Sequence, residues 1–185
     1  MHDTGPFYRP WGVVSPDFWE GATPVADPAR LDEETLRARF AEVADVATSG
    51  DLPHATTIAK RLDEDVTAVY GEVHLHTVNV REIRGYLGHL ANEHKQALGW
   101  YLHAVRLRAT VQGRGHPDTQ KASRRAYSLW VSIPVTPEWY QLGSELLSTL
   151  TDVLGSDSPL VQRTRERVVP RALAAVPSHQ AALGE

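Results

Sequence analysis

The chain contains an internal repeat with a constant offset of 42 residues, and this repeat limits the folds that the sequence can adopt. The columns that recur in all three segments include Gly71, Gly113 and Gly155; Val69, Val111 and Val153; and Ile58, Trp100 and Leu142. Repeats of roughly 20–50 residues are typical of stacked supersecondary units, because each unit buries its apolar face only against its neighbours. We therefore predict similar units that are stacked in order along the chain.

Apolar residues within the repeats follow the spacing of helices. The segment 53–70, for example, places apolar side chains at Ala55, Ile58, Leu62 and Val66, which form one stripe on a helix. No segment alternates with the period of two that a half-buried strand requires. We therefore expect an all-α fold. The predicted helices cover residues 34–48, 53–70, 78–91, 94–112, 117–133, 137–154 and 158–169.

Glycine, asparagine and proline mark the predicted helix ends. Gly50 and Asn92 share one column of the repeat, and both residue types tolerate the left-handed backbone between two helices. Pro117 and Pro159 fit the first turn of a helix, where no amide donor is lost. Pro170 is expected to end or kink the last helix. These positions predict helices that are joined by short turns.

One repeat carries a recognisable motif. It runs QALGWYLHAVRLR over residues 96–108 and continues with GRGHPDT over residues 113–119. The motif resembles the tetratricopeptide repeat, and more narrowly the 42-residue variant typified by kinesin light chain. That variant has a small residue, an aromatic residue and a second small residue, here Ala97, Tyr101 and Ala104. An Ile/Leu-Arg pair and a Gly-x-x-His-Pro-Asp-Thr segment then follow.

The resemblance implies an α-solenoid of about three antiparallel helix pairs with a capping helix, over residues 31–176. Its repeats would cover residues 36–77, 78–119 and 120–161. Trp139 stands where the family has a small residue, so we expect the helices to pack differently around it. Residues 1–30 and 177–185 lie outside this domain, as an N-terminal segment and a C-terminal tail.

The resemblance also implies a concave groove that binds a protein or peptide partner. The exposed faces of the helices near 78–91 and 117–133 would line it. Basic residues on these faces would favour an acidic ligand, although the alternative is a solvated helix surface without a ligand. The candidate groove residues are Arg81, Arg84, His89, Lys121, Arg124 and Arg125.

The N-terminal segment is rich in both aromatic residues and proline. Disordered tails contain few aromatic residues, so we expect an irregular strap that packs on the helices. The alternative is a docking segment for another protein, since aromatic side chains are enriched at interfaces. The aromatic residues of this segment are Phe7, Tyr8, Trp11, Phe18 and Trp19.

Composition excludes several other classes of protein. The chain has no cysteine, which excludes disulfides and thiolate chemistry. We find no apolar run long enough to span a bilayer and no secretion signal, so we expect a cytoplasmic protein. Residues 1–92 hold 15 acidic and 8 basic side chains, whereas residues 93–185 hold 8 acidic and 11 basic ones. This distribution can steer a partner, but it lacks the concentrated basic surface of a nucleic-acid-binding protein.

No catalytic motif is present, and the sequence predicts no catalytic residue, metal or cofactor. We find no phosphate loop, dinucleotide fingerprint or nucleophile elbow. The acidic run 63–65 is expected to be a solvated helix surface. Two alternatives to a scaffold remain. One is a regulatory module that senses a ligand or signal peptide, and the other is a metal protein or enzyme that uses His89, His94 and His103.

Overall fold

The computed structural model describes residues 8–9, 12–13 and 31–174 of the chain, with side chains for residues 31–168. Its elements are β1 (Tyr8–Arg9), β2 (Gly12–Val13), α1 (Glu33–Thr48), α2 (Leu52–Tyr70), α3 (Leu75–Leu90), α4 (His94–Val111), α5 (Pro117–Ser132), α6 (Pro137–Leu154) and α7 (Pro159–Ala174). The prediction of seven helices is confirmed over this part of the chain.

Apart from one-residue shifts at several helix ends, the structure differs from the sequence prediction at three places. The two-residue strands β1 and β2 pair antiparallel inside the predicted irregular strap, whose other residues lie outside the described ones. Helix α3 begins at Leu75, three residues earlier than predicted, because His74 caps it. Helix α7 continues past Pro170 to Ala174. A proline removes its own amide donor, and here the helix runs on for one more turn.

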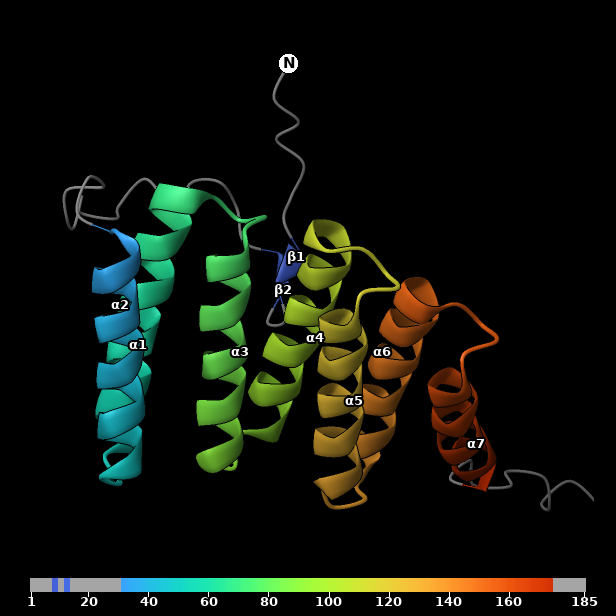
Figure 1. Cartoon of the computed structure of the whole chain (residues 1–185). Helices are drawn as coiled ribbons and strands as arrows, with labels where there is room; N and C mark the ends of the chain where they lie inside the picture. The colour runs from blue at the N-terminus through green and yellow to red at the C-terminus, as the bar shows by residue number, and fades with distance from the viewer. Residues whose placement is uncertain (1–7, 10–11, 14–30, 175–185) are drawn as a thin grey trace, which may run out of the picture.

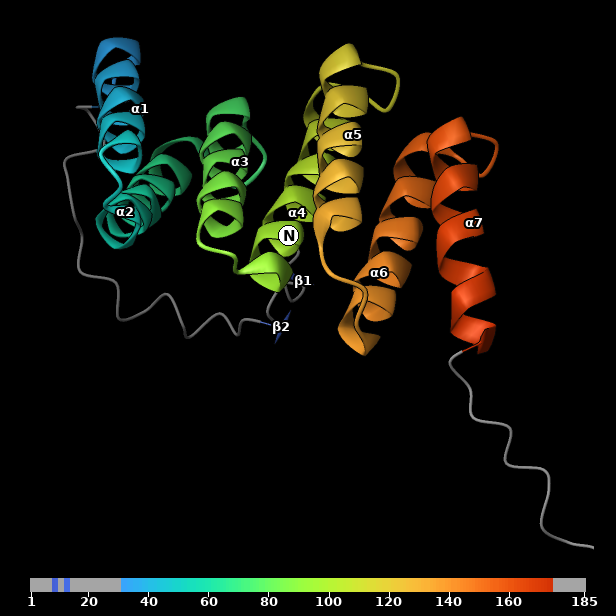
Figure 2. The ribbon, with the colours of Figure 1, turned by 90° about the horizontal axis from the view of Figure 1, so that it is seen from below.

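The helices pack in sequence order, side by side (Figure 1). Each helix contacts the next one, and α4 also contacts α6. Viewed from below, α1, α3, α5 and α7 lie along one side, and α2, α4 and α6 lie along the other (Figure 2). We call these two sides the odd row and the even row. Two clusters of buried apolar residues fill the space between the rows, one around α1–α3 and one around α4–α7.

Residues 42 positions apart adopt matching local geometry. Gly71, Gly113 and Gly155 have φ angles of 84°, 96° and 83°. Residues other than glycine are strained in this region of backbone conformation. In each case the glycine amide donates a hydrogen bond to the carbonyl four residues earlier. The hydroxyl groups of Thr77 and Thr119 donate to the carbonyls of Gly71 and Gly113, at 2.6 and 2.9 Å. The ends of α2 and α4 are therefore built alike.

The contact between paired helices varies along the chain. In the α3–α4 pair, Gly88 faces Ala97 so closely that a β-carbon on Gly88 would lie 3.3 Å from that of Ala97. The residues 42 positions later are Trp130 and Trp139, which stack in the α5–α6 pair with ring centroids 4.1 Å apart. The expectation that the packing around Trp139 differs is confirmed. The reason is that two indole rings occupy the place of a glycine and an alanine.

His74, at the start of α3, is expected to make the free energy of unfolding depend on pH. The Nδ1 atom of His74 accepts a hydrogen bond from the amide of His76 at 3.2 Å, and its ring stacks on Tyr70. Burial lowers the pKa of His74 below its ordinary value of 6.5, and the nearby His76 lowers it further. The unfolded chain therefore binds this proton more readily than the folded one, so acidification below about pH 6.5 removes stability.

Replacing His74 with Ser is expected to reduce this loss on acidification. Ser is a good cap, and it stands at the corresponding position before α7, as Ser158. Urea unfolding of both proteins at about pH 7.5 and about pH 5.5 measures the difference. An equal loss of stability in the wild type and in the His74→Ser variant would show that His74 does not cause it.

Candidate binding surface

The structure separates the six predicted groove residues into two groups. Arg81 is 1% exposed, and the side chain of Arg84 is 15% exposed. Both lie between α3 and the neighbouring even-row helices. The expectation that Arg81 and Arg84 lie on an exposed face is therefore wrong, because the buried carboxylate of Asp63 accepts hydrogen bonds from both.

A buried ion network connects α2, α3 and α4. Asp63 accepts hydrogen bonds from Nε of Arg81 at 3.2 Å and from Nη1 of Arg84 at 2.6 Å. Arg81 also forms an ion pair with Glu72, and its Nη1 atom donates to Nε2 of His103 at 2.6 Å. Buried charges require such partners, because an unpaired charge is expensive to remove from water. The network therefore serves the contact between helices.

The three histidines of the metal-site alternative do not lie together in one described cluster. His103 contacts Arg81 as described above. His89 and His94 lie at the ends of α3 and α4, and the Nδ1 atom of each is buried without a hydrogen-bond partner. Among the described residues, no group of three or more histidine, aspartate or glutamate side chains is placed to hold a metal ion. His89 is partly buried.

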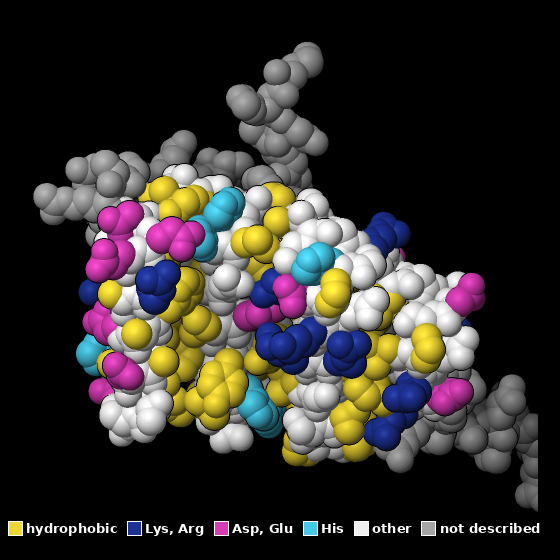
Figure 3. Space-filling model, in the orientation of Figure 1, with side chains coloured by type: hydrophobic (Ala, Val, Ile, Leu, Met, Phe, Trp, Pro, Cys, Tyr) yellow, Lys and Arg dark blue, Asp and Glu magenta, His cyan; other side chains and the backbone are white. Residues whose placement is uncertain are grey.

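The other three candidates form an exposed basic surface on α5. Lys121, Arg124 and Arg125 are all exposed. Arg125 donates to Glu82 at 3.1 Å, whereas no carboxylate within the described ranges pairs with Lys121 or Arg124. Figure 3 shows Lys and Arg side chains gathered over α5 and toward α7, while Asp and Glu side chains gather over α1. The structure thus brings together only the α5 half of the predicted site.

A first hollow, of about 270 Å³, lies between α3 and α5. A polar network within the protein occupies much of its surface. Arg108 donates to both oxygens of Glu82, at 2.7 and 3.0 Å, and to Asn79 at 2.9 Å. The hydrogen bond to Glu82 is the main cause that raises the pKa of Arg108. Glu82 thus accepts hydrogen bonds from two arginines, Arg108 and Arg125. The charges of this hollow are therefore largely compensated within the protein.

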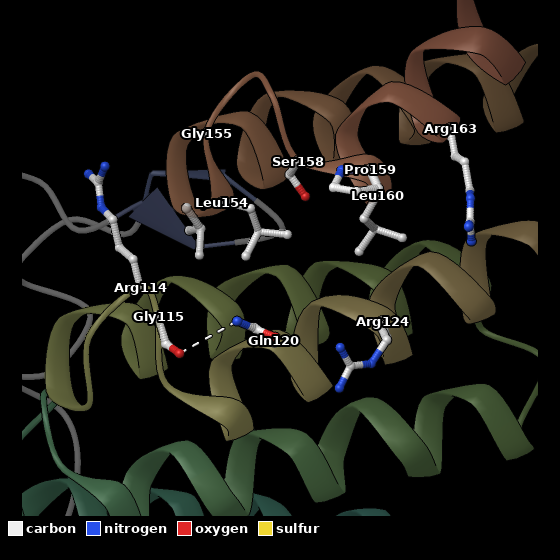
Figure 4. Close-up of a pocket in the computed structure, with 11 residues that line it drawn as sticks. Arg114, Gly115, Gln120, Arg124, Leu154, Gly155, Ser158, Pro159, Leu160 and Arg163 are labelled. Carbon is white, nitrogen blue, oxygen red and sulfur yellow. Dashed lines mark hydrogen bonds between the residues drawn. The ribbon is translucent and has the colours of Figure 1, made fainter.

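A second hollow, of about 570 Å³, lies between α5 and α7 (Figure 4). Its lining combines arginines with apolar side chains and includes no carboxylate among the described residues. In Figure 4, Arg163 extends from α7 toward α5, and Leu154 and Leu160 point toward α5 from above. The lining residues are Arg114, Gly115, Gln120, Arg124, Val153, Leu154, Gly155, Ser158, Pro159, Leu160 and Arg163.

A third hollow, of about 340 Å³, lies between α4 and α6 on the even row. Its lining includes His103, Arg106 and Glu145, and Arg106 donates to the hydroxyl group of Thr149 at 2.7 Å. This hollow has a carboxylate of its own, unlike the second one.

Sequence reasoning noted a basic cluster on the last helix but did not assign this helix to the groove. Arg163 lines the second hollow, but it is not among the predicted groove residues. The signal was present, because Arg163 follows Lys121 by 42 residues and so shares its column of the repeat. Arg114 lies in a turn between two glycines and gave no comparable signal.

Comparison with known protein families finds no family that matches this chain, and comparison with curated proteins finds no match. Within residues 31–174, no helix is both long enough and apolar enough to cross a bilayer.

Proposed function

We propose that this chain is a tetratricopeptide-like helical repeat protein that binds a protein or peptide partner along its odd row, without catalysing a reaction. Support for the repeat comes from the matching glycine conformations at Gly71, Gly113 and Gly155 and from the matching Thr77 and Thr119 hydrogen bonds. Support also comes from the side-by-side order of the helices. Units that stack in this way offer one extended surface to a ligand.

One observation carries the choice of the odd row. Helix α5 has a hollow on each side, and its exposed Lys121 and Arg124 have no carboxylate partner among the described residues. A preformed surface avoids much of the entropic cost of ordering on binding. Basic side chains without a carboxylate partner in the protein can form ion pairs with acidic groups of a ligand. The even-row hollow, of about 340 Å³, is smaller than the hollow between α5 and α7, of about 570 Å³, and already contains Glu145. The odd row is therefore the better binding surface.

The distribution of lysines allows a direct test. The sequence has three lysines: Lys121 lies on α5 of the odd row, whereas Lys60 and Lys95 lie on α2 and α4 of the even row. We expect an amine-reactive cross-linker to join a partner captured from native lysate to Lys121. Mass spectrometry of the linked peptides identifies the site. Links that reach only Lys60 or Lys95 would contradict the odd-row assignment.

A Lys121→Arg variant is the matched control for this experiment. It keeps the positive charge but removes the reactive amine. The variant should therefore capture the same partner while its cross-link at position 121 disappears. Loss of capture together with the link would mean that the lysine itself is required, beyond its charge.

A further inference from the structure

The two hollows of the odd row correspond to each other through the 42-residue offset. Four positions that line the hollow between α3 and α5 have their counterparts in the hollow between α5 and α7. Lys121 corresponds to Arg163, so a cation is kept at that position. The other three positions change in character: Glu82 becomes Arg124, Gln112 becomes Leu154, and Asp118 becomes Leu160.

These changes remove the carboxylates and leave only basic charges in the second hollow. Between α3 and α5, Glu82 accepts hydrogen bonds from Arg108 and Arg125. Between α5 and α7, an arginine stands in the place of that glutamate. No described carboxylate lies within ion-pairing distance of Arg124 or Arg163. The second hollow therefore has no counterpart to the carboxylate that Glu82 contributes to the first hollow.

The apolar changes add a second property. Leu154 and Leu160 replace a polar pair in which Gln112 donates to Asp118 at 3.4 Å. Both leucines are partly buried and pack against the core cluster of α4–α7, and both face the hollow (Figure 4). An aliphatic side chain placed here would lose water-exposed apolar area. The hollow thus has a cationic part beside an apolar part.

We propose that the hollow between α5 and α7 binds a peptide segment of a partner protein in which an Asp or Glu side chain stands beside an aliphatic one. The carboxylate supplies the charge that Glu82 supplies between α3 and α5, and it pairs with Arg124 and Arg163. The aliphatic side chain packs on Leu154 and Leu160. This inference rests on the proposed function, since it specifies the ligand of the odd row.

The volume of the hollow, about 570 Å³, agrees with this type of ligand, because small-ligand pockets usually measure roughly 300–1,000 Å³. Arginine also suits the role, since its planar guanidinium group matches the geometry of a carboxylate. A free inorganic anion would use the arginines but would leave the leucines without a contact.

Fluorescence polarisation with synthetic peptides tests the proposal. The probes are a labelled peptide that alternates Glu and Leu, an analogue with Gln in place of Glu, and an analogue with Ser in place of Leu. We expect the Glu-Leu peptide to bind at least about tenfold more tightly than either analogue, because each analogue loses one of the two contacts. Inorganic phosphate should compete weakly.

Two variants on α7 provide a matched comparison. Arg163 lines the hollow, whereas Arg165 is also exposed on α7 but does not line it. Arg163→Glu should weaken binding of the Glu-Leu peptide by about tenfold or more, and Arg165→Glu, with the same change of charge, should leave it nearly unchanged. Equal losses in the two variants would overturn the assignment to this hollow.

An Arg124→Glu variant tests the relation to Glu82 directly. It restores a carboxylate at the corresponding position, so we expect loss of peptide binding with no decrease in the melting temperature. Tight binding by this variant, or equal affinity for the Gln analogue, would overturn the inference. Cross-links at Lys121 that persist in the same variant would leave the proposed odd-row function intact, so the two failures are distinguishable.

Discussion

Replacing Asp63 with Ala is expected to lower the free energy of unfolding by about 3 kcal/mol or more, because the change removes a buried carboxylate that holds two arginines. Asp63 is 3% exposed and accepts hydrogen bonds from Arg81 and Arg84. Arg81 keeps Glu72 as a partner, but it remains 1% exposed with less negative charge around it. Urea denaturation, followed by circular dichroism, measures the change.

The neighbouring residue provides the control for this experiment. Glu64 is exposed, and its only described ion pair is a loose one to Lys60 at 3.9 Å. Glu64→Ala should therefore change stability by less than about 1 kcal/mol, as is usual for surface ion pairs. If Asp63→Ala changed stability no more than Glu64→Ala, the network would contribute nothing to the contact between α2 and α3.

The contrast between Asp63 and Glu64 shows where sequence reasoning succeeds and where it fails. The acidic run 63–65 was expected to be solvated, but only Glu64 is exposed, and Asp63 and Asp65 are both buried. Periodicity of apolar residues identified the helices, and glycine, asparagine and proline marked most of their ends to within one residue, because both signals are local. The burial of a charge depends on a partner elsewhere, such as Arg39, which donates to Asp65 at 2.7 Å. Single-residue patterns contain no such information.

The dependence of burial on distant partners also explains why the candidate site was predicted only in part. Arg81, Arg84 and Arg125 look alike in a sequence, since each is a basic residue on a predicted helix. The structure places Arg81 and Arg84 against Asp63, and Arg84 also lies over the ring of Trp100 at 3.9 Å from its centre. Lys121 and Arg124 have no such partner among the described residues and stay exposed. The repeat columns could have distinguished them, because the residue 42 positions before Arg124 is Glu82.

The second large effect is expected at Trp139, where the resemblance to the tetratricopeptide family would suggest a small residue. Trp139→Ala brings the sequence closer to that pattern, yet we expect it to cost about 3–5 kcal/mol of unfolding free energy. Trp139 is 2% exposed, it stacks on Trp130, and its Nε1 atom donates to the carbonyl of Trp130 at 3.1 Å. The substitution therefore leaves a cavity between α5 and α6.

A Trp139→Phe variant separates packing from hydrogen bonding. It keeps an aromatic ring for the stack but removes the Nε1 donor, so it should cost less than the alanine variant, by an amount nearer the roughly 1 kcal/mol of a single hydrogen bond. Chemical denaturation of all three proteins gives the comparison. A Trp139→Ala variant as stable as the wild type would mean that α5 and α6 close to the distance set by Gly88 and Ala97 in the α3–α4 pair. In that case the two tryptophans would fill the space between α5 and α6 but would not set the distance between these helices.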